Sequence, residues 1–94
     1  MNIGLDYDDT FTRDPIGWAA MASFMRQRGH KVYLVTWRDA EETNEDIQTL
    51  TKNLDGVYFT SRTGKERFMY AQGIRIDVWI DDNPRAIIQD MDKY

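Results

Sequence analysis

Short apolar runs alternate along this chain with segments whose apolar residues recur at helical spacing. Four of the runs have the length and composition of β-strands, at Asn2–Asp6, Val32–Val35, Val57–Phe59 and Ile76–Ile80. The second run is almost continuously apolar, as expected of a strand that is buried on both faces of a sheet. The alternation therefore predicts an α/β fold, in which helices cover a parallel sheet of about four strands.

Local signals mark where the first and last helices should begin. Asp14-Pro15 and Asn83-Pro84 each place a good N-cap residue before a proline, which is favoured at the first helical position. Gly29 should end the first helix. The apolar stripes expected to face the core are Trp18, Met21, Ala22 and Met25 in the first helix, and Ile87, Ile88 and Met91 in the last.

The two helices between them are predicted from a stripe and from a cap. Ile47, Leu50 and Leu54 recur at helical spacing. Thr63 and Glu66 have the spacing of a capping box, so that a further helix should begin after Thr63.

Length, charge and residue types narrow the possible functions. The 94 residues suit one domain, 1–94, and the net charge of −4 gives no overall attraction to nucleic acid. With no cysteine and one histidine, a metal site would need oxygen ligands, which suit magnesium, manganese or calcium. No apolar run has the length of a membrane span and the N-terminus does not resemble a signal peptide, so we expect a cytoplasmic protein without a membrane partner.

Paired acids follow two of the predicted strands. Asp6 and Asp8 follow the first strand, and Asp81 and Asp82 follow the fourth. If these strands are neighbours, four carboxylates crowd the edge of the sheet where ligands of α/β proteins bind. Such crowding is costly unless a cation or a proton is shared among them. The pattern predicts a metal-dependent acid site, although each acid alone could simply cap a turn or a helix.

Other residues near the strand ends have side chains suited to a phosphate. Thr36 closes the second strand with a hydroxyl, and Arg38 could bind an oxyanion with two parallel hydrogen bonds. Lys65 stands in a first helical turn, where a cation is mildly disfavoured, and this position would be explained if it offset the carboxylates. Trp37 could stack on a ring of a substrate, although packing is the commoner role of such a residue.

In this order the residues resemble the haloacid dehalogenase-like phosphohydrolases (the HAD superfamily), and the likeness spans nearly the whole chain. The family has four motifs: Asp-x-Asp-x-Thr after a strand, a Thr or Ser that closes a strand, a Lys near the start of a later helix, and a strand that ends in two acids. Their counterparts are Asp6, Asp8 and Thr10; Thr36; Lys65, with Lys52 as a rival; and Asp81 with Asp82. Asp9 departs from the pattern, since many members have glycine there.

The resemblance implies a Rossmann-like three-layer αβα sandwich and a phosphomonoester hydrolase. Asp6 would attack phosphorus to form an aspartyl-phosphate, while Asp8 would protonate the leaving group and later activate water. Magnesium would be held by Asp6, by the backbone carbonyl of Asp8, by Asp82 and, directly or through water, by Asp81. The residues that would bind the phosphorylated substrate are Thr10, Thr36, Trp37, Arg38 and Lys65.

The intervals between motifs are too short for a cap domain, so this would be a capless member of the family. An open site admits a nucleotide or a nucleic-acid terminal phosphate, and the Asp-Asp-Asn-Pro and Thr-Trp-Arg segments look most like the nucleotidase and polynucleotide-phosphatase branches. A second copy of the chain could cover the site. Two alternatives are a non-catalytic regulatory module on the same fold and a receiver-like domain, which would need an acid where the third strand ends in Phe59-Thr60.

Overall fold

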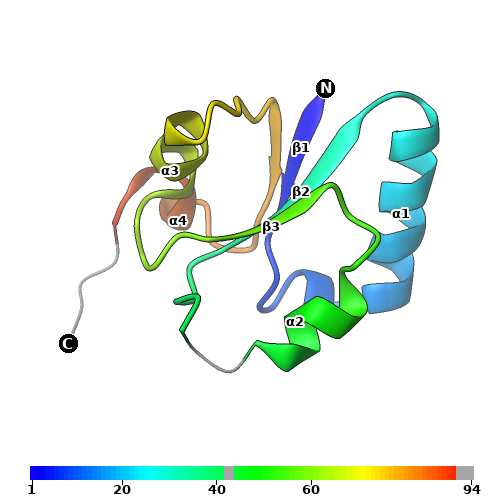
Figure 1. Ribbon diagram of the computed structural model, residues 1–94, viewed down its shortest axis with the longest axis horizontal. Helices are drawn as coiled ribbons and strands as arrows, with labels where there is room; N and C mark the ends of the chain where they lie inside the picture. The colour runs from blue at the N-terminus through cyan, green and yellow to red at the C-terminus, as the bar shows by residue number, and fades with distance from the viewer. Residues whose placement is uncertain (42–43, 91–94) are drawn as a thin grey trace.

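A single all-parallel sheet forms the centre of the molecule in a computed structural model that describes residues 1–41 and 44–90. Its spatial order is β3-β2-β1-β4 (Figure 1). The strands are β1 (Asn2–Leu5), β2 (Lys31–Thr36), β3 (Gly56–Phe59) and β4 (Val78–Ile80). The predicted α/β fold with a four-stranded parallel sheet is confirmed.

Helices cover both faces of this sheet (Figure 1). The chain runs from β1 to β2 to β3 in one direction and then crosses back to place β4 beside β1. Because crossovers between parallel strands are right-handed, this reversal moves the later helices to the opposite face. One face carries α1 (Pro15–Gln27) and α2 (Glu45–Leu50), and the other carries α3 (Lys65–Ala71) and α4 (Arg85–Ile88).

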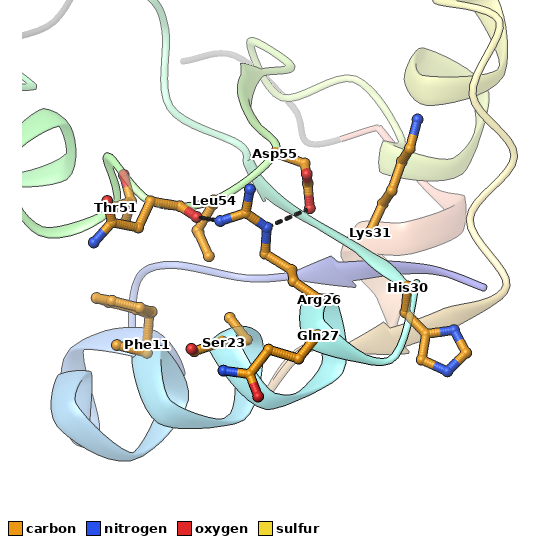
Figure 2. A pocket seen from close by; sticks show the side chains of 13 residues that line it. Phe11, Ser23, Arg26, Gln27, His30, Lys31, Thr51, Leu54 and Asp55 are labelled. Carbon is orange, nitrogen blue, oxygen red and sulfur yellow. Dashed lines mark hydrogen bonds and ion pairs between the residues drawn. The ribbon is translucent and has the colours of Figure 1, made fainter.

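Helix α1 has the boundaries that the sequence predicts. The Asp14 carboxylate accepts a hydrogen bond from the Gly17 N–H at 3.0 Å, and Pro15 is the first helical residue. Beyond the helix, Gly29 has a φ of 88°, a conformation that glycine adopts without steric cost. Near the end of α1, Arg26 forms an ion pair with Asp55 at 3.3 Å, which ties the helix to the turn before β3 (Figure 2).

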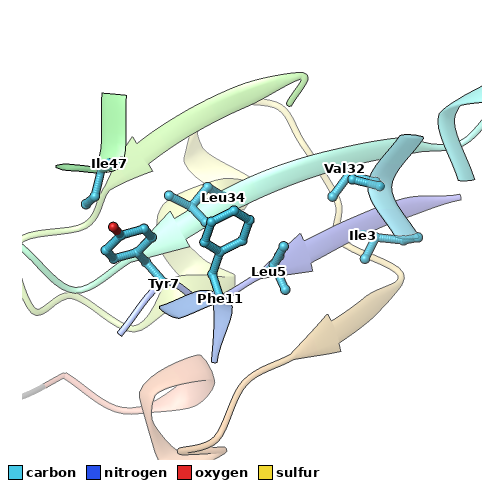
Figure 3. Close-up of a cluster of buried hydrophobic side chains, with 8 residues drawn as sticks. Ile3, Leu5, Tyr7, Phe11, Val32, Leu34 and Ile47 are labelled. Atoms are coloured by element: carbon cyan, nitrogen blue, oxygen red, sulfur yellow. The ribbon is translucent and has the colours of Figure 1, made fainter. Parts of the chain in front are cut away.

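The side chains of β2 alternate between two hydrophobic clusters, as the prediction of a strand buried on both faces requires. Tyr33 and Val35 pack with Met69 of α3 on one face. The other face carries the larger cluster, seven of whose members are labelled in Figure 3, and it consists of Ile3, Leu5, Tyr7, Phe11, Ala22, Val32, Leu34 and Ile47. The chain therefore forms its core from both surfaces of one central strand.

The predicted capping box at the start of α3 does not form. The N-cap is Gly64 rather than Thr63, and its N–H donates to the Asp90 carboxylate at 2.7 Å. A β-carbon at Gly64 would lie 2.7 Å from the backbone carbonyl oxygen of Ile88, so the close approach of the last residue of α4 needs a residue without a side chain here. A tertiary contact with Asp90 has replaced the local cap.

The last helix also differs from its prediction. It begins after Pro84, and the Asn83 N–H donates to the Asp81 carboxylate at 2.9 Å instead of Asn83 acting as the cap. Ile88 is 76% exposed, whereas Ala86 is buried, so the helix packs on a different stripe. The third predicted stripe residue, Met91, lies outside the described residues.

Helix α2 is shorter than its predicted stripe. It ends at Leu50, and Leu54 packs against the larger cluster from the turn that follows. Within residues 1–41 and 44–90, no helix is long and apolar enough to cross a bilayer.

The contact between β1 and β4 yields a prediction about stability. A β-carbon at Gly4 would lie 2.7 Å from two ring atoms of Trp79. Gly4→Ala should therefore lower the free energy of unfolding by about 1–3 kcal/mol, because overpacking forces the indole to move. In urea denaturation, Trp79→Leu in the Gly4→Ala background should recover part of this loss through a favourable coupling. A Gly4→Ala variant as stable as the parent would contradict this prediction, because it would show that the β-carbon fits without moving the Trp79 indole.

Candidate acid site at the carboxyl edge of the sheet

The strand order creates a crevice between the carboxyl ends of β1 and β4. The chain leaves β1 toward α1 on one face and leaves β4 toward α4 on the other, and ligands of open α/β sheets bind where neighbouring connections diverge in this way. A hydrogen bond of 2.9 Å from the Asp6 N–H to the Ile80 carbonyl continues the pairing of the two strands to this edge. The acids predicted from opposite ends of the sequence are thus brought together.

Three carboxylates form a cluster in this crevice. Asp6, Asp81 and Asp82 each offer an oxygen, and these oxygens lie within 4.8 Å of one another. The Thr10 hydroxyl lies 3.2 Å from Asp6 Oδ2 and 3.2 Å from Asp82 Oδ1, and it accepts the Asp82 N–H at 3.2 Å. Thr10 thereby joins the loop after β1 to the loop after β4.

Lys65 reaches the cluster from the first turn of α3. Its ammonium lies 2.7 Å from Asp6 Oδ1 and 2.6 Å from Asp81 Oδ2, and its side chain is only 2% exposed. The dipole of the helix does not favour a cation at this position, but two charge-assisted hydrogen bonds outweigh that effect. The rival, Lys52, is exposed in the turn that precedes β3. Of the two predicted lysines, the structure brings Lys65 to the acids.

The charge of the cluster is balanced incompletely by Lys65. Burial raises the pKa of Asp6 from 3.8 to about 7; the Lys65 ammonium opposes this shift and a hydrogen bond with Asp82 adds to it. The same hydrogen bond lowers the pKa of Asp82. The interaction between the two carboxyl groups thus favours the protonated form of Asp6 and the ionised form of Asp82.

This donor set fits a hard divalent cation. All three acids supply oxygen atoms that lie within 4.8 Å of one another, and a bound cation would offset the cost of burying their negative charge. Asp6, Asp81 and Asp82 are therefore the residues that would hold the predicted magnesium ion. The Asp8 carboxylate lies outside this group, and the ligand expected from Asp8 is its backbone carbonyl.

The Asp8 carboxylate is turned toward Arg38, in the loop after β2. Arg38 donates two hydrogen bonds to it, Nε to Oδ2 at 3.0 Å and Nη2 to Oδ1 at 2.7 Å. These bonds are the main reason why the pKa of Arg38 is raised above its ordinary value. The Arg38 guanidinium also lies 5.1 Å from the centroid of the Tyr7 ring, a cation–π distance. Two predicted site residues are thus bound to each other.

A pocket of about 180 Å³ connects these groups, with Thr36, Trp37 and Lys65 among the residues that line it together with the acids. Thr36 is buried, and its hydroxyl accepts the Arg38 N–H at 3.4 Å. The Trp37 ring N–H donates to the Ala86 carbonyl at 3.1 Å, which holds the indole against α4. Trp37 forms a fixed wall, and the cavity is smaller than a typical site for a whole small molecule.

Helix α2 and the residue before it contribute side chains that no sequence pattern predicted. Asp46 accepts a hydrogen bond from Arg38 at 3.2 Å and another from the Tyr7 hydroxyl at 3.2 Å. The Asn44 side-chain oxygen lies 3.4 Å from the same guanidinium. The signal available was the acid-rich segment after Arg38, since a loop that follows β2 must begin at the same edge as the loop that follows β1.

Unusual backbone conformations also gather at this edge. Asp9, Ser61 and Arg62 have φ values of 62°, 51° and 64°, in the left-handed region. The loop after β3 is fixed in part by hydrogen bonds to the loop after β2, from the Arg62 N–H to the Trp37 carbonyl at 2.9 Å and from the Ser61 N–H to the Arg38 carbonyl. Strained residues of this kind concentrate at functional sites.

Comparison of the chain with protein-family models, with curated proteins and with solved structures gives no match in any of the three.

The two lysines can be separated by their effect on stability. Lys65→Gln should lower the free energy of unfolding by about 3 kcal/mol at pH 8, because it leaves carboxylates buried without their cation. Lys52→Gln, at an exposed position, should change it by less than about 0.5 kcal/mol. Chemical denaturation in EDTA measures both, and equal midpoints for the two variants would contradict the role given to Lys65.

Asp6 should make the ion-free protein less stable as pH rises. A carboxyl whose pKa is 3.8 when unfolded and about 7 when folded contributes stability below pH 4, and this contribution is lost between about pH 4 and pH 7. Asp6→Asn cannot ionise, so its stability relative to the parent should grow by roughly 2 kcal/mol across that window; this is less than full linkage because the site is partly hydrated. Melting curves in EDTA that differ by a constant amount from pH 4 to pH 8 would refute this.

Proposed function

We propose that the chain is a capless phosphohydrolase of the HAD superfamily that hydrolyses phosphomonoesters with magnesium. The observation that carries the proposal is the buried contact of Lys65 with Asp6 and Asp81, at the edge where β1 and β4 diverge. Three carboxylates provide ligands for a divalent cation, while Lys65 and Arg38 provide positive charge for a phosphate dianion. The fold and the resemblance of the four motifs support the same conclusion.

Asp6 is the nucleophile in this proposal. One of its carboxylate oxygens forms a bond to phosphorus as the bond from phosphorus to the leaving oxygen breaks, which gives an aspartyl-phosphate. Lys65 holds the attacking carboxylate in place and offsets charge on the phosphoryl oxygens. Bound magnesium would supply further positive charge, which favours the ionised form of Asp6 that attack requires.

Asp8 handles protons in both halves of the reaction. Its carboxyl group protonates the leaving alkoxide, and the resulting carboxylate then removes a proton from the water that attacks the aspartyl-phosphate. Release of inorganic phosphate restores Asp6. Because Arg38 binds Asp8 in the structure, a substrate phosphate that attracts the Arg38 guanidinium would also free Asp8 for this role.

The proposed substrate is a nucleotide or the terminal phosphate of a nucleic acid. A cavity of about 180 Å³ accommodates the phosphoryl group but leaves the rest of such a molecule outside. With the buried Thr36 and the fixed Trp37 at its wall, the site selects the phosphate more closely than the leaving group. A second copy of the chain that covers the site would exclude water from it.

One observation favours the alternative of a non-catalytic phosphate-binding or metal-binding module. Asp8 is held in a two-bond ion pair in which Arg38 engages both oxygens of its carboxylate. If the pair persisted when phosphate bound, the fold would retain a ligand without turning it over.

Turnover of p-nitrophenyl phosphate tests the proposal. With magnesium, Asp6→Asn should reduce kcat by about 10³-fold or more, since it removes the nucleophile, and Asp8→Asn should reduce it by about 10²-fold or more. Asp14→Asn, which keeps a good helix cap close in sequence to both, should retain the parent rate. EDTA should abolish turnover, and added magnesium should restore it.

The same set of proteins separates catalysis from binding. Equal rates for the parent and Asp6→Asn would reject Asp6 as the nucleophile. Calorimetric binding of magnesium and phosphate without turnover, on nucleotides and on end-phosphorylated oligonucleotides, would favour the non-catalytic module.

A further inference from the structure

A second pocket lies away from the acid cluster, between α1 and the turn that joins α2 to β3 (Figure 2). Its volume of about 640 Å³ exceeds the 180 Å³ of the pocket at the acids. This volume falls within the range of pockets that hold small molecules in proteins. None of the residues given a role in the proposed reaction lines it.

The floor of this second pocket is apolar. Phe11 and Ala22 belong to the larger hydrophobic cluster, and Leu54 packs against that cluster from the turn after α2. Ser23 and Gln27 of α1 contribute a polar wall on one side. A ligand with an aromatic or branched aliphatic body would therefore bury apolar surface against this floor.

The charge at the rim of the second pocket favours an anion. Arg26 extends from α1 toward the opposite wall, where its Nη1 donates to the Asn53 carbonyl and its Nε lies 3.3 Å from Asp55 Oδ2 (Figure 2). That same Asp55 oxygen accepts the Val32 N–H at 2.7 Å. Within the described chain, Nη2 of Arg26 has no partner, and the exposed Lys31 forms no ion pair. Arg26 and Lys31 thus bring two positive charges to the lining of the pocket, whereas Asp55 brings one negative charge and already accepts the Val32 N–H.

We propose that this second pocket binds a small amphipathic anion. Its apolar body would contact Phe11 and Leu54, and its carboxylate-like group would accept hydrogen bonds from the unpartnered Nη2 of Arg26. This proposal does not depend on the proposed phosphatase activity, because the two pockets are lined by different residues.

An occupant of this pocket would be in contact with the loop that carries the acids. Phe11 stacks on Tyr7, with ring centroids 5.7 Å apart and an interplanar angle of 19°, and the Phe11 N–H donates to the Asp6 carbonyl at 3.2 Å. The Tyr7 ring in turn lies 5.1 Å from the Arg38 guanidinium, which binds Asp8. A ligand that displaces Phe11 would therefore also shift Asp6 and the Arg38–Asp8 pair, because these groups are in contact through Tyr7 and the loop after β1.

Titration of the ¹⁵N-labelled full chain with 4-(trifluoromethyl)benzoate tests the proposal, with 4-(trifluoromethyl)benzamide as the neutral probe of matched shape. The benzoate should give saturable amide shifts at Phe11, Ser23 and Leu54, with a Kd in the millimolar range or below. The benzamide should bind roughly tenfold more weakly, because it lacks the anionic group for Arg26. Equal binding of both probes, or benzoate shifts that map to the acid cluster, would overturn the proposal.

Two variants examine the same pocket from different sides. Arg26→Gln should weaken benzoate binding roughly tenfold, while Arg28→Gln, an exposed cation outside the pocket, should leave it unchanged. Ser23→Leu keeps every charge and fills space, so it should block binding even if Arg26→Gln fails to fold. Undiminished binding to Ser23→Leu would overturn the site, and benzoate shifts that stop short of Tyr7 would overturn its connection to the acid loop.

Discussion

The acid site depends on one buried cation. Lys65 lies at the start of α3, on one face of the sheet, and its ammonium contacts Asp6 from the loop after β1 and Asp81 from the loop after β4. Without this charge the carboxylates could not share so small a volume, since each would lose hydration without gaining a partner. Lys65 thereby connects three segments that meet only because the strand order reverses beside β1.

The single positive charge of Lys65 does not neutralise the three carboxylates of the cluster. The acids near it therefore differ in burial and in the partners that they bind. Burial, together with a hydrogen bond to Asp82, raises the pKa of Asp6 although the Lys65 ammonium opposes the shift. The Asp8 carboxylate instead pairs with Arg38. The structure thus separates two carboxyl groups that are near neighbours in sequence into a buried group and an exposed one, which is the kind of difference that assigns distinct roles to paired acids.

Much of the fold follows from the sequence because each strand is a compact apolar run and each acid pair comes directly after one. The neighbouring positions of β1 and β4, on which the meeting of Asp6 with Asp81 depends, were a condition of the prediction, because no local pattern fixes the order of strands in a sheet; the structure supplies that order. What local patterns could not supply were contacts between distant segments. The Asp90 carboxylate replaced Thr63 at the start of α3, and Asp46 joined Arg38 from α2. Neither contact leaves a periodic signal, because each depends on how two loops meet in space.

The hydrogen bond from the Gly64 N–H to the Asp90 carboxylate connects the edge that carries the acids to the last residue that the structure describes. Gly64 immediately precedes Lys65, and Arg67 forms an ion pair with the same Asp90 at 2.8 Å. Truncation or fusion that disturbs Asp90 would loosen the first turn of α3 and so shift the lysine that faces the acids, although Asp90 itself is remote from them in sequence. Tags for biochemical work are therefore better placed on the amino-terminal side, where Met1 lies at the opposite edge of the sheet (Figure 1).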